Sequence, residues 1–424
     1  MFGRNFRDLT PPEDRGPLRV MFVHTEVVVG GAETLLLEII RNMDRERFEP
    51  ELCCLKQLAE LGEVIAKEVP SHVGLLQHKF DYKVLGRLTD LLRDRKTDAV
   101  VTIGTGGDRM FWGRLAAWRA NVPVILSSLH ATGYPMKVER INRMLAPITD
   151  GFIGCAPTHS KFLVAGEGCP RNKVFTVWNG VDVDRFRLRE RAQMRGRLDI
   201  PNDIPVAGIV AALRPEKKHL MLVDAWADVV QRLPDALLLI VGDGVERQSI
   251  EQRVNELGLS NNVRLLGTRH DVPEVLSAMD LKVLSSGMEA NPASTLEAGA
   301  CGLPVVAPAV GSLPDTVIEG ETGLLVEPNN AVALSDAIVK ILSLADRGRS
   351  MGQAAHDLVR DRFSMEVLVG GYECLIDGLY RAAVRGSRLT PAAHQQRMEE
   401  LVQRIAAERG NEGCSDLVVD PIVI

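Results

Sequence analysis

The chain has 424 residues, of which 46% are hydrophobic and 25% are charged, and its formal net charge is −6. At roughly 100–200 residues per domain, this length exceeds one compact core and indicates two domains. The negative charge argues against a nucleic acid as the main partner, because phosphate binding depends on clustered Lys and Arg.

The N-terminal sequence and the cysteines bear on cellular location. The first twenty residues contain no apolar segment of signal-peptide type. No window approaches the ~18 uninterrupted apolar residues that a membrane span requires, so we expect a cytoplasmic protein. The seven cysteines are scattered and never form C-x-x-C. Buried thiols are therefore expected, and neither a disulfide framework nor a zinc site.

The N-terminal half alternates short apolar runs with segments long enough for helices. The run LRVMFV predicts a strand, and Gly30 and Gly31 separate it from a helix whose apolar residues, Leu35 to Met43, have helical spacing. Further strands are predicted at 51–55, 98–103, 122–127, 150–155 and 173–178. Strands that alternate with helices indicate a parallel, doubly wound sheet.

A second series of the same kind follows in the C-terminal half. Apolar runs predict strands at 204–213, 236–242, 263–267, 281–286, 303–308 and 323–328. The charged segment 185–203 between the two series has turn residues at both ends, as expected for an exposed interdomain connection. We therefore predict a flexible tail at 1–16, an N-terminal Rossmann-like domain at 17–184 and a C-terminal one at 204–363.

After Phe363 the sequence predicts two more helical segments. Residues 364–384 form a closing helix. Residues 385–424 form a helical extension with an apolar stripe that includes Met398 and Leu401. Its last eight residues, LVVDPIVI, are apolar enough to need a partner surface. Formation of a homo-oligomer through this extension is therefore an open alternative. Ligands of open α/β sheets bind beyond the carboxyl ends of the strands, and two facing domains are expected to enclose a cleft.

The segment SSGMEANPASTLEAGACGLPVV carries the strongest chemical signal. Glu289 falls in the loop after a predicted strand, and Glu297 falls in the helix that follows. Asn291 is expected to cap this helix, which leaves free N–H groups near Ser294 and Thr295. A helix N-terminus is a natural seat for a diphosphate, and Glu297 is placed to accept from a ribose diol. Taken alone, Glu297 is more simply explained as an acid that complements the helix dipole, and Glu289 as a solvated acid in a loop.

Two loops of other predicted strands carry cations and glycines. The segment ALRPEKKH follows a strand and opens a helix, which places Arg214 and Lys217 at a cleft edge. A cation fixed there stabilises the charge on a leaving diphosphate, although ordinary surface cations are the alternative. Gly30 and Gly31 let the backbone approach a phosphate or an acceptor closely. Neither this pair nor Gly242-Asp243-Gly244 has the spacing of a dinucleotide site.

These motifs together resemble glycosyltransferase family 4, the large group of retaining GT-B enzymes. The resemblance extends from about Leu18 to Tyr380. It is carried by E-x7-E with the following A-x-A-C-G-L-P-V-V and, in order along the chain, by Gly30-Gly31-Ala32-Glu33, His130, Asn179-Gly180-Val181-Asp182, Leu213 with Pro215-Glu216-Lys217, Val241-Gly242-Asp243-Gly244 and Thr322-Gly323-Leu324-Leu325-Val326.

The resemblance implies a GT-B hexosyltransferase (EC 2.4) that transfers a sugar, with retention, from a nucleotide-sugar donor to an acceptor. The acceptor, a glycan, a lipid-linked group or a small molecule, is not named by the sequence. We expect that no metal or other cofactor takes part, because Lys217, Arg214 and a helix N-terminus can supply the positive charge that a bound cation would otherwise contribute. Glu289 would bind donor-sugar hydroxyls, Glu297 the ribose and Lys217 the leaving phosphate, while His130 would lie at the catalytic cleft. The N-terminal domain would then take the acceptor and the C-terminal domain the donor.

The sequence departs from the commonest family pattern at two places. Ala211-Ala212 replaces glycine and arginine before the leucine, so Arg214 is expected to supply the second cation. Ala290-Asn291 replaces the frequent Gly-Phe after the first glutamate, which leaves the identity of the sugar open.

Other patterns leave alternatives open. Asp182-Val183-Asp184 has the form of a D-x-D metal motif, but it offers only two ligands, and we expect no metal there. The helices around Arg109–Arg119 and Met136–Leu145 combine long apolar and basic residues, so they either dock on the inner face of an anionic membrane or pack on the core. A sugar-nucleotide epimerase and a catalytically idle sugar-nucleotide-binding scaffold are the alternative functions.

Overall fold

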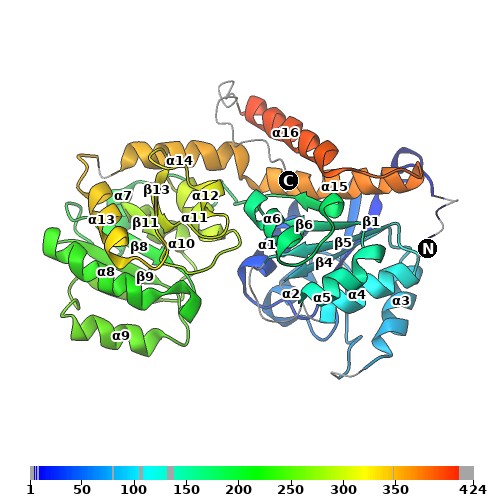
Figure 1. The fold of residues 1–424 in the computed structure, drawn as a ribbon, viewed down its shortest axis with the longest axis horizontal. Helices are drawn as coiled ribbons and strands as arrows, with labels where there is room; N and C mark the ends of the chain where they lie inside the picture. The colour runs from blue at the N-terminus through cyan, green and yellow to red at the C-terminus, as the bar shows by residue number, and fades with distance from the viewer. Residues whose placement is uncertain are drawn as a thin grey trace. The chain divides into compact units, whose positions relative to one another are not determined.

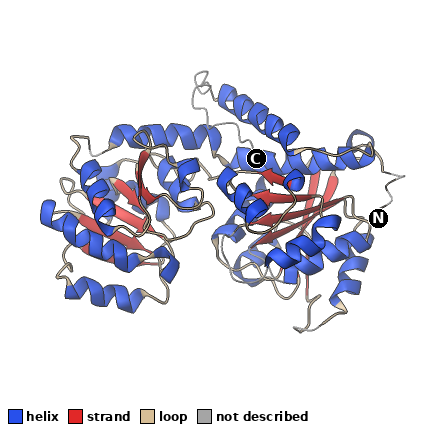
Figure 2. Ribbon diagram, viewed as in Figure 1, coloured by secondary structure: helices blue, strands red, loops and turns tan. Residues whose placement is uncertain are grey.

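The structure is a computed structural model that describes residues 4, 6, 9–78, 81–104, 108–130, 138–346 and 348–409. The chain forms two compact units. Unit 1 consists of Met1–Gly180 and Met365–Ile424, and unit 2 consists of Val181–Ser364. In each unit the strands form a central layer between helices (Figures 1 and 2).

Unit 1 is built on a parallel sheet of seven strands in the order β3-β2-β1-β4-β5-β6-β7. The strands are β1 (Leu18–His24), β2 (Phe48–Cys54), β3 (Ser71–Val73), β4 (Ala99–Gly104), β5 (Val124–Leu129), β6 (Gly151–Gly154) and β7 (Val174–Thr176). The helices are α1 (Gly31–Asn42), α2 (Ala59–Ile65), α3 (Val84–Asp94), α4 (Asp108–Arg119), α5 (Val138–Leu145), α6 (Pro157–Ala165), α15 (Met365–Val384) and α16 (Pro391–Glu408).

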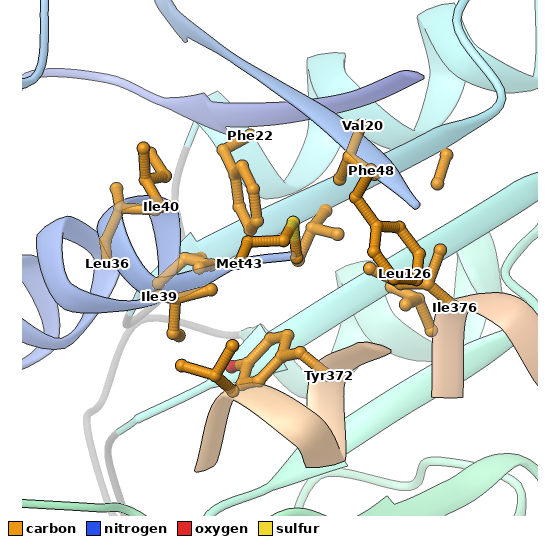
Figure 3. Packing of buried hydrophobic residues seen from close by; sticks show 14 of the residues in the cluster. Val20, Phe22, Leu36, Ile39, Ile40, Met43, Phe48, Leu126, Tyr372 and Ile376 are labelled. Atoms are coloured by element: carbon orange, nitrogen blue, oxygen red, sulfur yellow. The ribbon is translucent and has the colours of Figure 1, made fainter. Parts of the chain in front are cut away.

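The side chains of β1 show how this sheet is covered on both faces. Because successive residues of a strand point to opposite faces, Val20 and Phe22 enter one core and Met21 and Val23 enter another. The first core contains residues of α1 and α15, and the second contains residues of α3 and α4. Figure 3 shows the first core, in which Tyr372 of α15 lies among apolar side chains.

Unit 2 contains a parallel sheet of six strands in the order β10-β9-β8-β11-β12-β13. The strands are β8 (Val206–Val210), β9 (Leu237–Val241), β10 (Val263–Gly267), β11 (Leu281–Val283), β12 (Val305–Pro308) and β13 (Gly323–Val326). The helices are α7 (Arg191–Arg197), α8 (His219–Arg232), α9 (Arg247–Glu256), α10 (Val272–Ser277), α11 (Ala293–Ala300), α12 (Leu313–Thr316), α13 (Ala331–Leu342) and α14 (Arg349–Arg362). Two doubly wound parallel sheets were predicted, and this part of the prediction is confirmed.

The prediction of an exposed linker at 185–203 is wrong, because the whole segment belongs to unit 2. It contains α7, in which Arg195 is only 1% exposed. The Arg195 guanidinium donates to Asp280 at 2.7 Å and to the Ala278 carbonyl at 3.0 Å. The chain instead passes between the units next to Val181 and Ser364, which pair with each other.

The ends of the chain also differ from the prediction of a free tail and a separate extension. Within the expected tail 1–16, Arg15 donates to Asp98 at 2.9 Å and to the Tyr380 hydroxyl at 2.7 Å, so this part is fixed to unit 1. Helix α15 completes the core of unit 1. The apolar stripe of α16 packs on Val367 of α15 through Met398 and Leu401, among others, so it is covered within unit 1. The segment LVVDPIVI lies outside the described residues.

The basic helices of unit 1 direct one of their cations inward. Arg114 of α4 is fully buried, donates to Asn142 of α5 at 3.0 Å and lies over the Phe152 ring. Burial lowers the pKa of this guanidinium to about 10. Core packing therefore accounts for Arg114, while Met136 and Lys137 lie outside the described residues. None of the helices in the described ranges has the length and apolar character needed to cross a membrane.

The described cysteines are free thiols, and five of them are buried. Cys374 is partly exposed, and Cys414 lies outside the described residues. The expectation of buried thiols is confirmed for Cys53, Cys54, Cys155, Cys169 and Cys301.

Candidate functional site

The candidate donor site of unit 2 lies where its strand order changes direction. Strands β8 and β11 are neighbours in the sheet although they are far apart in sequence. In doubly wound sheets, ligands bind at the carboxyl edge beside such a switch point. The loop after β8 carries Arg214 and Lys217, and the loop after β11 carries Glu289, so the topology brings the predicted cations and the first glutamate to one edge.

Two glycines hold the loop after β8 in place. Gly242 and Gly244 have positive φ angles of 132° and 158°. A Cβ atom at Gly242 would lie 2.0 Å from the Ala211 carbonyl oxygen, and one at Gly244 would lie 2.5 Å from that of Leu213. The Leu213 N–H also donates to the Asp243 carbonyl at 3.0 Å. This close backbone contact, which only glycine permits, fixes the 3-10 turn Pro215–Lys217 that follows.

Lys217 and Glu289 meet directly. The Lys217 Nζ donates to Glu289 Oε1 at 2.6 Å, and the two side chains are 22% and 7% exposed. Their loops are also joined through the backbone, because Ser285 Oγ donates to the Lys217 carbonyl at 2.7 Å and Gly287 N–H donates to the Glu216 carbonyl at 2.8 Å. Charge-assisted hydrogen bonds of this kind are strong and directional, so the pair is preorganised.

Glu297 lies on α11 next to a buried lysine that the sequence analysis did not single out. Lys282 of β11 is 0% exposed, and burial lowers its pKa to about 7, while the negative charges of Glu297 and Glu289 oppose this shift. Burial raises the pKa of Glu297, and the positive charges of Lys282 and Arg185 oppose it. One signal could have identified Lys282: a lysine inside a buried strand requires acidic neighbours, and both glutamates follow it within one motif.

The start of α11 differs from the expected capped helix with free donors. The helix begins at Ala293 after Pro292, and among the described residues no side chain caps it, so Asn291 is not the expected cap. The Thr295 N–H and hydroxyl both donate to the Pro292 carbonyl, at 3.1 and 2.7 Å. Thr295 is 4% exposed and lines a small pocket. Its N–H is therefore used inside the turn, whereas Ser294 is partly exposed, as are Pro292 and Ala293.

Arg214 precedes Lys217 in the same turn. Its side chain is exposed, and its carbonyl accepts the Lys217 N–H at 3.0 Å. The backbone thus holds Arg214 beside the Lys217–Glu289 pair without burying its guanidinium. This position is compatible with the expected second cation.

The remaining predicted site residues belong to unit 1. Gly30 and Gly31 begin α1 at the carboxyl end of β1, beside the switch point between β1 and β4. A Cβ atom at Gly30 would lie 2.5 Å from Glu33 Oε2, while one at Gly31 would meet no atom within 4 Å. Glu33 Oε1 also lies 3.3 Å from the ring nitrogen Nε2 of the buried His24. A side chain at position 30 would therefore collide with Glu33, whereas one at position 31 would meet no other atom.

His130 directly follows β5 and is part of a hydrogen-bond chain. Its Nε2 lies 3.0 Å from Ser128 Oγ, and Ser128 Oγ lies 2.6 Å from the Tyr372 hydroxyl of α15. The sequence predicted His130 as a site residue but did not identify Ser128 or Tyr372. A tyrosine more than two hundred residues away along the chain gave no local signal.

Asp182 has a structural role in its turn. Its Oδ1 accepts the backbone N–H groups of Asp184 at 3.0 Å and of Arg185 at 2.9 Å. Across the part of the chain that the structure describes, no group of three or more His, Cys, Asp and Glu side chains is placed to hold a metal ion.

Comparison with known proteins identifies the family. The model of Glycosyltransferase Family 4 matches residues 29–185, and that of Glycosyl transferases group 1 matches residues 190–357. A D-inositol 3-phosphate glycosyltransferase from Segniliparus rotundus is 33% identical over 361 residues, which are 82% of this chain and 75% of the relative. The chain belongs to glycosyltransferase family 4.

Other relatives and solved structures agree with this assignment. An N-acetyl-alpha-D-glucosaminyl L-malate synthase from Bacillus anthracis is 32% identical over 206 residues, which span 49% of this chain and only 54% of that relative. The structure of Alr3699/HepE from Anabaena has a TM-score of 0.76 at 21% identity, covering 85% of this chain and all of that one. Sucrose-phosphate synthase from Thermosynechococcus elongatus has a TM-score of 0.68 at 20% identity, covering 86% of this chain and 100% of that one. The predicted GT-B fold is confirmed.

Proposed function

We propose that this glycosyltransferase moves a sugar from a nucleoside-diphosphate donor to an acceptor hydroxyl with retention of anomeric configuration. The Lys217–Glu289 pair is the observation that carries the proposal, because it joins a cation and a sugar-binding carboxylate at the switch point of unit 2. Relatives support the class of donor: HepE was solved with UDP-glucose, and a mannosyltransferase from Mycolicibacterium smegmatis is described as GDP-mannose-dependent.

Each residue has a role in this proposal. Glu289 accepts hydrogen bonds from hydroxyls of the donor sugar, and Glu297 accepts from the ribose. Lys217, assisted by Arg214, stabilises the negative charge that develops on the leaving diphosphate. Gly30 and Gly31 allow the backbone of unit 1 to approach a substrate.

The reaction requires one bond to break and one to form on the same face of the sugar. The bond from the anomeric carbon to the diphosphate oxygen breaks, and the acceptor oxygen bonds to that carbon. The acceptor proton passes to the departing phosphate oxygen. Because Lys217 and Arg214 supply positive charge, we propose that transfer needs no divalent metal.

Two measurements test this function. A thermal-shift screen with UDP-, GDP- and ADP-sugars identifies the donor, since a ligand at 100 times its dissociation constant stabilises a protein by about 2.7 kcal/mol. Proton NMR of the first product from an α-linked donor is then expected to show an α linkage. A β-linked first product would refute retention, and an epimerised donor without transfer would favour the epimerase alternative. Stabilisation without any product would favour the idle scaffold.

Two proposed associations of unit 1 are tested separately. Flotation with vesicles that contain an anionic lipid tests peripheral membrane contact through the basic helices. Light scattering of the full chain and of a chain that ends at residue 409 tests whether the C-terminal extension forms a homo-oligomer.

A further inference from the structure

A buried chain of hydrogen bonds connects α15 to the end of β5 in unit 1. It runs from the Tyr372 hydroxyl to Ser128 Oγ at 2.6 Å and from Ser128 Oγ to His130 Nε2 at 3.0 Å. Ser128 is 0% exposed and Tyr372 is 1% exposed, whereas His130 is partly exposed. Two buried hydroxyl groups thus lie behind an imidazole at the carboxyl edge of the sheet.

Either hydroxyl of the first hydrogen bond could be the donor, and the surroundings of Tyr372 favour one direction. The ring belongs to an apolar cluster that includes Ile39 and Ile376, as Figure 3 shows. If Ser128 donated to the phenol oxygen, the phenol proton would point into this cluster, and an unsatisfied buried donor is costly. The apolar surroundings therefore favour Tyr372 as the donor to Ser128. Burial also raises the pKa of Tyr372 above its ordinary value, so the phenol keeps this proton.

The direction of the second hydrogen bond follows from the first. Ser128 Oγ has one proton, and with Tyr372 donating to its oxygen this proton is available for His130 Nε2. A neutral imidazole whose Nε2 accepts a hydrogen bond carries its own proton on Nδ1. The chain of hydroxyls thus specifies one of the two tautomers of His130.

We propose that Tyr372 and Ser128 are positioning residues that fix the orientation and the Nδ1–H tautomer of His130 for glycosyl transfer. The inference rests on the proposed function in one respect: it takes His130 to lie at the catalytic cleft of the glycosyltransferase, as the family resemblance implies. It extends that function to two residues that the sequence motifs do not contain. One of them, Tyr372, comes from the segment that returns to unit 1 after unit 2.

The test combines three variants with two measurements. Tyr372→Phe removes the donor to Ser128, and Ser128→Ala removes the link to His130. Tyr380→Phe is the matched control, because it removes a phenol hydroxyl from the same helix whose partners are Arg15 at 2.7 Å and the Thr10 carbonyl at 3.1 Å. The measurements are the ¹⁵N spectrum of labelled histidine in the full-length protein, assigned with His130→Gln, and kcat and KM with the donor found in the screen.

The expected spectrum of the unaltered protein shows His130 protonated on Nδ1. Tyr372→Phe and Ser128→Ala are expected to shift it towards the Nε2–H tautomer. They are also expected to lower kcat by about 10-fold or more, by analogy with the loss seen when hydrogen-bond partners of metal-ligating histidines are removed, with little change in KM of the donor. Tyr380→Phe is expected to leave both the tautomer and kcat unchanged.

Several results would overturn the inference or limit it. An Nε2–H signal for His130 in the unaltered protein would refute the assigned direction of the hydrogen bonds. Equal losses of kcat in Tyr372→Phe and Tyr380→Phe, with the tautomer unchanged, would show a stabilising role only and overturn the positioning role. If His130→Gln kept full activity while Tyr372→Phe still shifted the tautomer, the proposed catalytic role of His130 would fail and the hydrogen-bond assignment would be supported.

Discussion

Lys217→Ala is expected to affect both stability and turnover, because Lys217 is the side-chain partner of Glu289 at 2.6 Å. Breaking a fully buried ion pair costs about 3–5 kcal/mol, and an exposed pair contributes about 0–1 kcal/mol. With exposures of 22% for Lys217 and 7% for Glu289, this pair lies between the two limits. We expect Lys217→Ala to lower the free energy of unfolding by about 2 kcal/mol, the cost of a charged group left unpaired and mostly buried.

A second substitution separates the unpaired charge from other effects. Glu289→Gln in the Lys217→Ala background removes the uncompensated carboxylate, so the double variant is expected to regain about 1–2 kcal/mol. Arg232→Ala is the control, because the Arg232–Asp336 pair is well exposed in the same unit and should contribute at most about 1 kcal/mol. Urea denaturation measures the unaltered protein, the single variants Lys217→Ala and Glu289→Gln, the double variant and Arg232→Ala. Strictly additive losses for Lys217→Ala and Glu289→Gln would refute the energetic coupling of the pair.

Turnover tests the proposed role of the same lysine in the reaction. The Lys217→Ala protein that remains folded is expected to lose about 10²–10³ in kcat, because the ammonium group acts on charge that develops as the diphosphate departs. A loss of less than tenfold would contradict this role and leave Lys217 as a structural partner of Glu289.

Three further predictions concern the same site. Lys282 has a pKa of about 7 in the folded protein against 10.5 for the free group, so the unfolded chain binds more protons between these values and stability should rise with pH across them. Lys282→Met should abolish this rise in urea denaturation at about pH 6 and about pH 9, whereas Lys340→Met, at an exposed position, should preserve it. By calorimetry, Glu297→Ala should weaken binding of the free nucleoside diphosphate and Glu289→Ala should spare it; equal losses would contradict the assigned roles. Turnover should persist in excess EDTA, and full loss that Mg²⁺ or Mn²⁺ restores would refute metal independence.

The sequence predicted the strands of both sheets except the short β3, because a buried parallel strand requires a continuous apolar run. The runs at Leu18, Val124 and Leu237 all begin strands of the structure. It failed at 185–203, where the charged composition indicated an exposed linker. The charge of the buried Arg195 is neutralised by Asp280, which lies in another segment of the chain. This long-range ion pair cannot be read from the local composition.

The sequence predicted the part of the candidate site that follows from both the residue types and the order of the strands. Lys217 and Glu289 follow neighbouring strands, so their proximity follows from the fold class. The local backbone of α11 was not predictable to the same degree, because Asn291 and Thr295 each have several hydrogen-bonding conformations available in a turn. Tyr372 was missed because nothing in an amphipathic helix marks which buried residue reaches a site.

The insertion of unit 2 into the chain of unit 1 has a consequence for the proposed site. Unit 1 buries one face of its sheet only when α15 supplies side chains such as Leu368, Tyr372 and Ile376, and each fully buried apolar side chain contributes about 1.5–3 kcal/mol. These residues follow the whole of unit 2 in sequence. The ends of the insertion are held together, since the Val181 N–H donates to the Phe363 carbonyl at 2.8 Å. The hydroxyl that we propose to set the tautomer of His130 therefore reaches Ser128 only when the core of unit 1 is complete. This order of the chain couples the arrangement of a proposed site residue, His130, to the folding of the unit that holds it.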